Sequence, residues 1–279
     1  MWKLGFIGAG NMATAIIGGV LSSDGVKDAK AHIIVSDYSK ERLCFVADKY
    51  GVHVTEENST VAGNAEILFL AVKPDAYDAV IAEIRDSVKP DTIVVILAAG
   101  LSIASVQEMF SGVSQSAPAS RHTDPKLIKV MPNTPAMVNQ GMTALCAAEN
   151  VTTEEFAAVT EIFRAIGKAE KLPEALFDAF TAVAGSSPAY VYTFIEALAD
   201  AGVKHGLTRT QAIQAAAQAT LGAAAMVLET NIHPAALRDA VCSPSGTTIA
   251  AVAALEREGF RHAVISAADA CVERYNDLK

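Results

Sequence analysis

The sequence predicts an α/β fold over its first part and an all-helical fold over the rest, and three observations support this division. Short apolar runs alternate with helical patterns up to residue 166, as in a parallel sheet with crossover helices. The first apolar run ends in a glycine-rich turn that opens a helical pattern. No strand pattern recurs after residue 167. We therefore expect a Rossmann-type dinucleotide-binding domain over residues 1–166 and a helical domain for dimerisation and substrate binding over residues 167–279.

The composition limits the classes of protein to which the chain can belong. Hydrophobic residues make up 51% of the 279 residues and charged residues only 19%, which is more apolar material than the core of one monomer needs. The surplus is alanine-rich and lies in the second half, which predicts a buried subunit interface. A formal net charge of −9 gives no electrostatic support to nucleic-acid binding.

The cysteines and the apolar runs predict a cytoplasmic protein without a membrane span. The four cysteines form neither a C-x-x-C pair nor a zinc spacing, which favours a reducing compartment and no bound metal. The longest apolar run, around residues 212–228, is interrupted by polar side chains. Residues 1–3 lead directly into a strand pattern, so we expect no signal peptide.

The first predicted element is a strand over residues 3–7, followed by a glycine-rich turn and a helix. Gly8 permits the tight bend, Gly10 lets a pyrophosphate reach the helix amino terminus, and Ala13 lets the helix pack on the strand. The pattern G-x-G-x-x-A is weak evidence alone, but its position between a strand and a helix makes it strong. The expected dinucleotide contacts here are Ile7, Gly8, Ala9, Gly10, Asn11 and Met12.

The second predicted strand, over residues 31–37, ends in Asp37. An acid at this position usually binds the ribose 2′-hydroxyl of NAD and repels the 2′-phosphate of NADP. Neighbouring side chains, those of Ser36, Ser39, Lys40 and Arg42, could instead receive that phosphate. The two cations are equally well explained as the solvated first turn of a helix, so the choice between NADH and NADPH stays open. We expect cofactor contacts at Ser36, Asp37 and Asn58, the last at a predicted helix start.

Two nearly all-apolar strands follow, over residues 66–72 and 92–97, as expected of a parallel sheet covered on both faces. A helix is predicted between them, over residues 76–88. The loops after such strands lie at the carboxyl edge of the sheet, where open α/β folds bind ligands. The residues of these two loops are Ala71, Val72, Lys73, Pro74, Ala98, Ala99 and Gly100.

The rest of the first part contains a polar segment and two more strands. Residues 111–126 are polar and without periodicity, which predicts a loop without chemistry. A strand over residues 127–131 then leads into Pro-Asn-Thr-Pro, whose two prolines fix a rigid turn. We expect this turn to present the side chains of Asn133 and Thr134, and a strand over residues 142–148 to complete the sheet.

From residue 152 onward, across the end of the first part and the whole of the second, the sequence is predicted to consist of helices. The first two span residues 152–165 and 174–184. After a break at residues 185–188, a third helix begins with Ser187 as its cap and runs to about residue 205, and a fourth spans residues 208–229. The last of these is apolar on nearly all faces. Because such a helix must be buried on all sides, it predicts a partner chain.

A segment of small hydroxyl residues, 242–248, lies between two further helical patterns. Free N–H groups at the start of the second helix, together with its dipole, favour an anion. Gly246 lets a ligand approach the backbone, and Ser243, Thr247 and Thr248 add hydroxyl donors. An ordinary helix corner with Ser and Thr as caps is the alternative interpretation.

This segment and its flanks resemble the signature of the pyrroline-5-carboxylate reductases. The matching positions are Pro234, Leu237, Val241, Cys242, Ser243, Gly246, Thr248, Ala251, Val252, Leu255 and Glu256. The runs at residues 71–74, 98–100 and 132–135 are similar to cofactor loops of that family. The resemblance implies reduction of 1-pyrroline-5-carboxylate to L-proline by an intertwined homodimer, with a ring of dimers left open. It also implies NADPH as the usual donor, although Asp37 makes NADH a possible or even the preferred donor.

The resemblance implies roles for individual residues as well. The substrate carboxylate would sit on the amides and hydroxyls of Ser243, Gly246 and Thr247. Thr248 would be the catalytic hydrogen-bond partner of the ring nitrogen, and Glu174 would approach the substrate amine. The dinucleotide would lie along residues 71–74 and 98–100, with Asn133 and Thr134 near its nicotinamide.

Two other interpretations are weaker. A β-hydroxyacid dehydrogenase has a similar layout, but it places a catalytic lysine a few residues after a glycine-rich turn at the start of the long helix. Here the turn at residues 185–188 is followed by no lysine before Lys204. A dinucleotide-binding regulator without catalysis would need the cofactor turn but no substrate loop, and this chain has both.

Overall fold

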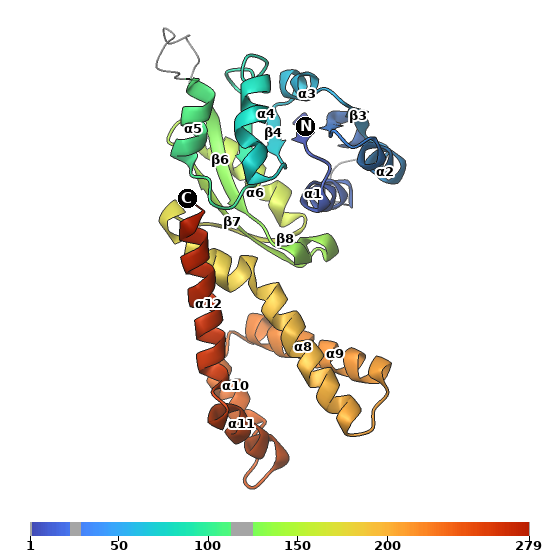
Figure 1. Cartoon of the computed structure of the whole chain (residues 1–279), viewed down its shortest axis with the longest axis vertical. Helices are drawn as coiled ribbons and strands as arrows, with labels where there is room; N and C mark the ends of the chain where they lie inside the picture. Colours follow the sequence, from blue (N-terminus) through green and yellow to red (C-terminus); the bar gives the residue numbers. More distant parts are fainter. Residues whose placement is uncertain (1, 23–28, 113–124, 279) are drawn as a thin grey trace. The chain divides into compact units, whose positions relative to one another are not determined.

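The computed structural model describes residues 2–22, 29–112 and 125–278 (Figure 1). The chain divides into two compact units. The sheet unit comprises Met1–Gly185 and Cys271–Lys279, and the helical unit comprises Ser186–Ala270. The sequence-based domain boundary after residue 166 stays a prediction. Most of the polar segment predicted as a loop, residues 113–124, lies outside the described residues.

The sheet unit is built on one eight-stranded sheet of order β3-β2-β1-β4-β5-β6-β7-β8. All neighbouring strands are parallel except β6 and β7, which are antiparallel. The strands are β1 Leu4–Ile7, β2 Ile33–Ser36, β3 His53–Thr55, β4 Ile67–Leu70, β5 Ile93–Ile96, β6 Lys126–Met131, β7 Gly141–Ala147 and β8 Gly167–Lys171. The chain order reverses between β1 and β4, which is the point at which ligands of such sheets bind.

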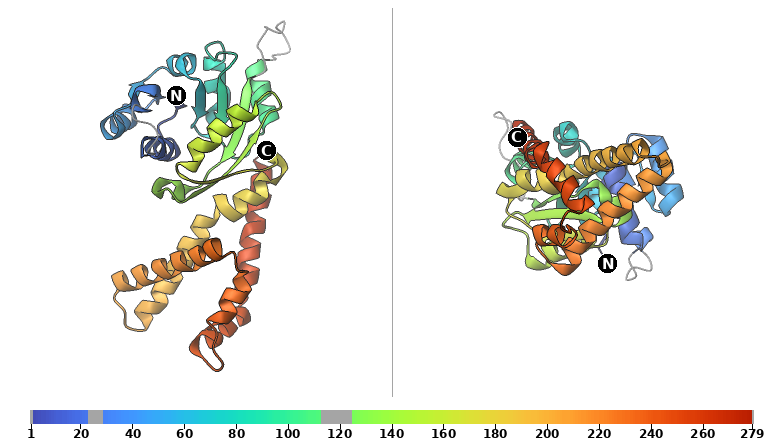
Figure 2. Two further views of the ribbon diagram at one scale, coloured as in Figure 1. Left: turned by 180° about the vertical axis from the view of Figure 1, so that it is seen from behind. Right: turned by 90° about the horizontal axis from the view of Figure 1, so that it is seen from below.

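Helices cover both faces of this sheet (Figures 1 and 2). The α-helices are α1 Asn11–Ser22, α2 Lys40–Tyr50, α3 Asn58–Asn64, α4 Tyr77–Ile84, α5 Ile103–Ser111, α6 Thr153–Arg164 and α7 Phe177–Phe180. The shorter turns are η1 Ala29–His32, η2 Pro74–Ala76, η3 Thr134–Val138, η4 Glu174–Leu176 and the π-helical η5 Thr181–Gly185.

Two buried clusters, one on each face, hold the layers together. One cluster joins side chains of α1, α2 and α6 to the strand residues on one face of the sheet. The other joins side chains of α3, α4 and α5 to the strand residues on the opposite face. Phe6 stacks on Phe69 with ring centroids 4.5 Å apart, and Phe163 meets Phe69 edge-on at 6.2 Å. The predicted alternation of strand and helix is therefore confirmed.

The prediction that no strand follows residue 167 is wrong. β8 pairs parallel with β7, although its sequence, Gly-Lys-Ala-Glu-Lys, is too polar to show a strand pattern. It lies at the sheet edge, where pairing on one side suffices. Gly167 has φ 149°, and a Cβ there would collide with the backbone of Gly141, so only glycine fits.

Three helix boundaries also differ from the predictions. α4 ends at Ile84 rather than at residue 88, and Pro74–Ala76 before it is a separate 3₁₀ turn. α8 begins at Ser187, so Ser186 rather than Ser187 takes the capping position and Pro188 lies in the first turn. Residues 174–185 wind irregularly through η4, α7 and η5.

The helical unit contains α8 Ser187–Lys204, α9 Arg209–Thr230, α10 Pro234–Ala240, α11 Thr247–Arg257 and most of α12 Phe260–Asp277. α8 and α9 pack as a hairpin (Figure 2), and Thr208 with Gln211 forms a capping box at the start of α9. Its buried apolar cluster consists of three alanines, Ala199, Ala212 and Ala216, with Ile195 partly buried against them. Among the described residues, no helix is long and apolar enough to cross a membrane.

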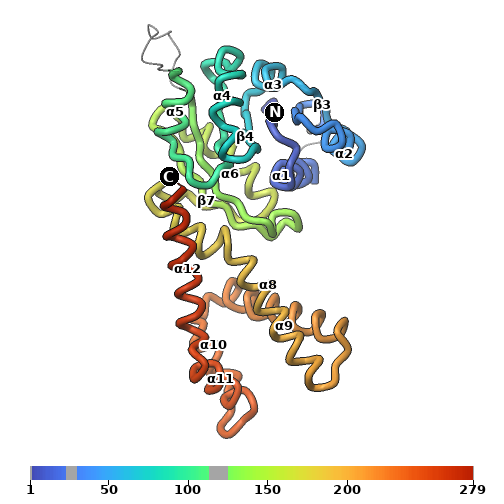
Figure 3. Tube along the Cα trace, in the orientation of Figure 1, coloured from blue at the N-terminus to red at the C-terminus, as the bar shows by residue number. Residues whose placement is uncertain are grey.

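The end of α12 belongs to the sheet unit. Tyr275 is 4% exposed and packs in a small cluster with Met131, Ala144 and Phe177 (Figure 3 traces the chain). Leu278 lies so close to Gly100, at φ 82°, that a Cβ on this glycine would lie 2.9 Å from the Leu278 carbonyl oxygen. The sheet unit is therefore assembled from both ends of the chain.

Candidate active site

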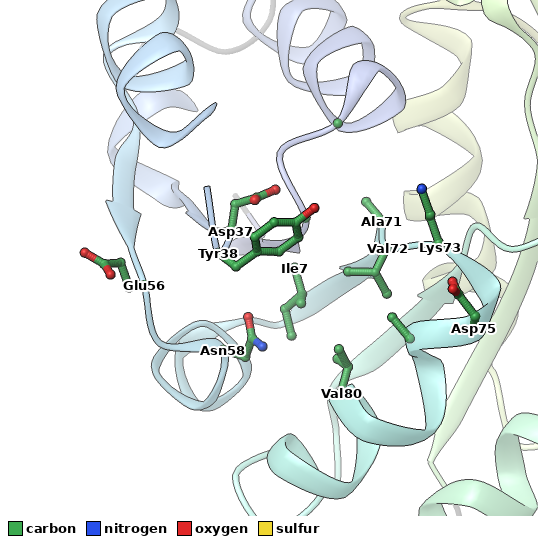
Figure 4. A pocket seen from close by; sticks show the side chains of 13 residues that line it. Ile7, Asp37, Tyr38, Glu56, Asn58, Ala71, Val72, Lys73, Asp75 and Val80 are labelled. Carbon is green, nitrogen blue, oxygen red and sulfur yellow. The ribbon is translucent and has the colours of Figure 1, made fainter. Parts of the chain in front are cut away.

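A cavity of about 500 Å³ opens at the carboxyl ends of β1, β2 and β4 (Figure 4). Eight residues predicted to contact the dinucleotide line it: Ile7, Gly8, Gly10, Asp37, Asn58, Ala71, Val72 and Lys73. Five further lining residues were not predicted: Tyr38, Glu56, Asp75, Ala76 and Val80. Asp37, Tyr38 and Glu56 lie on one side of the cavity, and Val72, Lys73 and Asp75 lie on the other.

The glycine turn has the geometry that a pyrophosphate requires. Gly8 has φ 101°, and a Cβ there would lie 2.6 Å from the carbonyl oxygen of Ala71, so β1 and β4 leave no room for a side chain. A Cβ on Gly10 would have no atom within 4 Å, so the turn faces open space there. α1 begins directly after it, at Asn11, with its free N–H groups. These features fit a dinucleotide phosphate.

The peptide of Ala9, in the middle of this turn, is held on both sides. Its N–H donates to Asp37 Oδ2 at 2.7 Å, and its carbonyl accepts from Arg42 Nε at 2.9 Å and from Nη2. The other Asp37 oxygen accepts from the Ser39 N–H at 2.8 Å. The acid predicted to contact a ribose thus also fixes the phosphate turn, through bonds that the sequence pattern does not reveal.

The two cations considered as phosphate receivers both have protein partners. Arg42 holds the Ala9 carbonyl and lies over the Phe45 ring at 5.2 Å. Lys40 Nζ lies 3.1 Å from Glu56 Oε1 on the surface, with both side chains largely exposed. The cavity wall near Asp37 is therefore acidic.

Ser36 and Asn58 form a hydrogen-bonded pair at the cavity wall. The Ser36 hydroxyl is fully buried and donates to Asn58 Oδ1 at 2.8 Å. The amide nitrogen of Asn58 donates to Glu83 Oε2 at 2.8 Å. Asn58 therefore lines the cavity, and the buried Ser36 hydroxyl orients the Asn58 side chain.

The Pro-Asn-Thr-Pro turn does not present both polar side chains, which corrects the expectation. Asn133 is buried: its Nδ2 donates to the Ala184 carbonyl and its Oδ1 accepts from the Met142 N–H, both at 2.9 Å. Thr134 is exposed at the start of η3. The turn therefore offers Thr134 to a ligand, whereas the Asn133 amide ties the turn to neighbouring backbone.

Glu174 is engaged within the sheet unit. Its Oε1 accepts from Lys129 Nζ at 3.0 Å and from the Ile103 N–H at 3.0 Å. The Lys129 side chain is 3% exposed and lies 5.0 Å from the centre of the Phe177 ring. Burial beside this pair raises the pKa of the Cys146 thiol to about 12, so this thiol is no nucleophile. The predicted substrate role of Glu174 stays a prediction.

The segment with the predicted substrate-binding residues lies in the helical unit. Ser245 has φ 56°, and the Gly246 N–H donates to the Ser243 carbonyl at 3.0 Å, which turns the chain into α11. Gly246 caps this helix without a side-chain bond, so the first N–H groups are open. Ser243, Thr247 and Thr248 are exposed. Exposed hydroxyls and open amides are thus gathered at the start of α11, as an anion site needs.

Comparisons with known proteins agree along the whole chain. Residues 174–278 match the family profile for pyrroline-5-carboxylate reductase dimerisation, and residues 3–100 match that for NADP oxidoreductase, coenzyme F420-dependent. The pyrroline-5-carboxylate reductase of Escherichia coli is 46% identical over 276 residues, covering 99% of this chain and 98% of that protein. That of Arabidopsis thaliana is 37% identical and covers 99% of this chain and 95% of that protein.

The chain belongs to the pyrroline-5-carboxylate reductase family.

Solved structures of this family have the same fold. A pyrroline-5-carboxylate reductase from Coxiella burnetii superposes with a TM-score of 0.87 at 34% identity, covering 100% of this chain and 98% of that one. The Plasmodium falciparum pyrroline carboxylate reductase with NADP bound gives 0.85 at 30% identity, with coverages of 99% and 98%. Family membership confirms the resemblance, the NAD(P)-dependent oxidoreductase class and the pairing of a Rossmann-type domain with a helical dimerisation domain.

Proposed function

We propose that this chain reduces 1-pyrroline-5-carboxylate to L-proline, binding the substrate at the segment around Thr248 and taking the hydride from a reduced nicotinamide dinucleotide. The full-length identity to reductases of this family carries the proposal. The dinucleotide supplies a hydride when bound. The cavity with its glycine turn would hold it, because open space beside Gly10 and free N–H groups of α1 suit its pyrophosphate.

The carboxylate of the substrate would be held at the start of α11. The open N–H groups after Gly246 and the exposed hydroxyls of Ser243 and Thr247 are donors matched to a carboxylate, and the helix dipole adds to their effect. Seating the ring by its carboxylate leaves the C=N bond free to face the hydride donor. Such positioning is worth on the order of 7–11 kcal/mol of the barrier in favourable cases.

Thr248 would be the catalytic residue. Its exposed hydroxyl follows the carboxylate-binding N–H groups by one residue and would hydrogen-bond the ring nitrogen. When the ring nitrogen already carries a proton, hydride adds to the iminium carbon and the C=N π pair becomes the lone pair of the neutral amine, so the step needs no strong protein acid. This explains how a site of hydroxyls and amides, without a histidine, performs the reduction.

For the cofactor, we propose that the chain accepts both NADPH and NADH and that Asp37 lowers its preference for NADPH. The match to an NADP oxidoreductase profile and the NADP-bound relative support NADPH. Against a strong preference, Asp37 and Glu56 line the cavity, while Arg42 and Lys40 already have partners. A 2′-phosphate entering there would meet carboxylates, whereas a 2′-hydroxyl could donate to one.

We further propose that the chain is a cytoplasmic homodimer, with larger rings of dimers left open. The match of residues 174–278 to a dimerisation profile supports the dimer, as do the many apolar side chains on α8, α9, α11 and α12. All four cysteines lie among the described residues and are free thiols, which agrees with a reducing compartment.

The experiment that tests this function is a turnover assay with the purified chain, following the absorbance of the reduced nicotinamide, which falls on reduction of the imine and rises on oxidation of a hydroxyacid. Turnover is expected with 1-pyrroline-5-carboxylate and either dinucleotide, and none with 3-hydroxyacids and the oxidised dinucleotides. Dinucleotide binding without turnover of either substrate class would refute the proposal and favour a regulator. Turnover of 3-hydroxyacids alone would favour a β-hydroxyacid dehydrogenase.

A further inference from the structure

The first residue of α4, Tyr77, has the largest fully buried side chain among the described residues. Its hydroxyl donates to the Leu70 carbonyl at 2.6 Å and accepts from the Leu97 N–H at 3.1 Å. Leu70 is the last residue of β4, and Leu97 directly follows β5. One side-chain oxygen therefore joins the carboxyl ends of two neighbouring strands.

The hydroxyl occupies a place in the β4–β5 ladder that backbone groups would otherwise fill. The two strands are parallel, with Leu68 opposite Val94 and Leu70 opposite Ile96. At the start of the pair, the Ile93 N–H donates to the Glu66 carbonyl at 2.9 Å. Donors on one strand of a parallel ladder recur every second residue, so the same series would pass through the Val95 N–H and the Leu68 carbonyl and then join the Leu97 N–H to the Leu70 carbonyl. The tyrosine hydroxyl stands between these two groups and bonds to both.

This insertion separates the strand ends at a functionally important edge. Leu70 is followed by residues 71–74, three of which line the dinucleotide cavity, and Leu97 is followed by residues 98–100. Both loops therefore start at an atom bonded to the same hydroxyl. The bridge consists of two hydrogen bonds in the buried interior, where the Tyr77 ring is held by the surrounding apolar cluster.

We propose that Tyr77 is a positioning residue that sets the spacing of the two cofactor loops, 71–74 and 98–100, by holding β4 and β5 apart at their carboxyl ends. This inference rests on the proposed dinucleotide site at that edge. Without the hydroxyl, either the Leu70 carbonyl and the Leu97 N–H stay unpaired, or the strands close to bond directly. Both results move the loops relative to each other.

The bridge works across the pH range of any assay. Burial raises the pKa of Tyr77 well above its usual value, so the hydroxyl keeps its proton and remains a donor to the Leu70 carbonyl.

A second hydroxyl in the same strand pair provides a matched control. Thr92, 2% exposed and directly before β5, donates through Oγ1 to the Ala65 carbonyl, two residues before β4, at 3.1 Å. It joins the same two strands at their amino ends, where none of the predicted cofactor loops lies. Thr92→Val and Tyr77→Phe thus each remove one buried bridging hydroxyl while keeping the shape of the side chain.

The experiment compares the two variants in the full chain by melting temperature, by the Kd for NADPH from its fluorescence, and by steady-state kinetics. Both variants are expected to lose roughly 2–6 °C in Tm, because each leaves buried backbone groups unpaired. Tyr77→Phe alone should raise the Kd and KM for NADPH, by about five-fold or more, with the KM for 1-pyrroline-5-carboxylate within about two-fold of the wild type.

Two outcomes would overturn the proposal. An equal rise in the NADPH Kd for Tyr77→Phe and Thr92→Val would show that lost stability alone weakens binding. An unchanged Kd for Tyr77→Phe, with a lowered Tm, would show that the hydroxyl serves stability only. Since the Kd is measured without substrate, a failure of the proposed reaction would appear separately, as NADPH binding without turnover.

Discussion

The two units of this protein use their apolar residues in opposite ways. In the sheet unit, large side chains such as Phe6, Phe69 and Phe163 are fully buried between the sheet and its helices. In the helical unit, the buried hydrophobic residues among those described are Ala199, Ala212 and Ala216. Its large apolar side chains are exposed in the single chain, among them Tyr192, Leu198, Leu221, Met226, Leu228 and Ile265. The sheet unit has a hydrophobic core of its own. The helical unit instead exposes large apolar side chains of the kind that become buried when two copies associate.

The difference bears on function. The glycine turn is held by the hydrogen bonds of Asp37 and Arg42 to Ala9, which all lie within one chain, so dinucleotide binding is a property of the sheet unit. The segment around Thr248 belongs to the unit that lacks a core. We therefore expect changes in the helical unit to act through assembly and catalysis, and changes in the sheet unit to act through the dinucleotide and local stability.

The largest effect should come from placing charges on the exposed apolar face of α9. Leu221 and Leu228 are each 59% exposed and lie two turns apart on this helix. The double change Leu221→Asp and Leu228→Asp should prevent dimer formation and lower kcat/KM on the order of 100-fold or more, since an obligate dimer has no stable monomer. Size-exclusion chromatography with light scattering measures the assembly.

Phe45→Asp is the control for this prediction. Phe45 is an exposed aromatic residue of comparable size, at 43% exposure, but it lies on α2 in the sheet unit. The control should remain a dimer. A double variant that stays dimeric and active would contradict the view that α9 needs a second copy.

The next effect should be purely catalytic. Thr248→Ala should lower kcat/KM for 1-pyrroline-5-carboxylate about ten-fold or more, a loss of ~1.4 kcal/mol in transition-state binding. The Kd for NADPH should not change, because Thr248 lies outside the sheet unit. Thr220→Ala, which removes a threonine hydroxyl bonded to its own helix at the Ala216 carbonyl, is the matched control in the same unit. Equal kinetics for all three proteins would remove Thr248 from the mechanism.

A smaller effect, confined to the sheet unit, should follow from Asp37→Ser. Removing the carboxylate should raise the ratio of kcat/KM for NADPH to that for NADH by about five-fold, because the repulsion of the 2′-phosphate is lost. Glu41→Ser removes the same charge from the first turn of α2 without lining the cavity, and should leave the ratio unchanged. If both variants shift the ratio alike, general charge rather than Asp37 sets the preference.

The smallest effect concerns the ion pair of Lys126 with Glu155, whose Nζ and Oε1 lie 2.6 Å apart. Burial tends to raise the pKa of Glu155, but bonds from Lys126 and Thr152 outweigh it, so the pKa is lowered. A lowered carboxyl pKa contributes stability above the unfolded value, and this stability is lost as the pH falls through the folded value. The bond to Glu155 raises the pKa of Lys126, whose contribution persists until strongly alkaline pH.

Lys126→Met should therefore lower the free energy of unfolding by ~0.5–1 kcal/mol at neutral pH, and the difference should disappear as the pH falls through the lowered pKa of Glu155. Chemical denaturation of both proteins at several pH values measures it. A difference that persists in acid would assign the effect to lost packing of the lysine stem.

Much of the fold could be predicted because its strands are buried on both faces. Residues 66–72 and 92–97 are apolar throughout, and the glycine turn has few structural alternatives. β8 escaped prediction because an edge strand needs no apolar pattern. At the site, the hydrogen bond from Arg42 to the Ala9 carbonyl and the burial of the Asn133 side chain depend on contacts between residues distant in sequence, which local patterns do not encode. The αL conformation of Ser245 was missed for another reason: serine gives no signal for it.

The return of the last turn of α12 to the sheet unit has a consequence for how the protein is made. Tyr275 and Leu278 complete the surroundings of Phe177 and Gly100, yet they follow the whole helical unit in the sequence. The nucleotide-binding half therefore cannot finish folding until the helical unit has been synthesised, although most of its own sequence comes first. A nascent chain that stops before residue 271 would lack this piece, and with it the packing of Leu278 against the 98–100 loop.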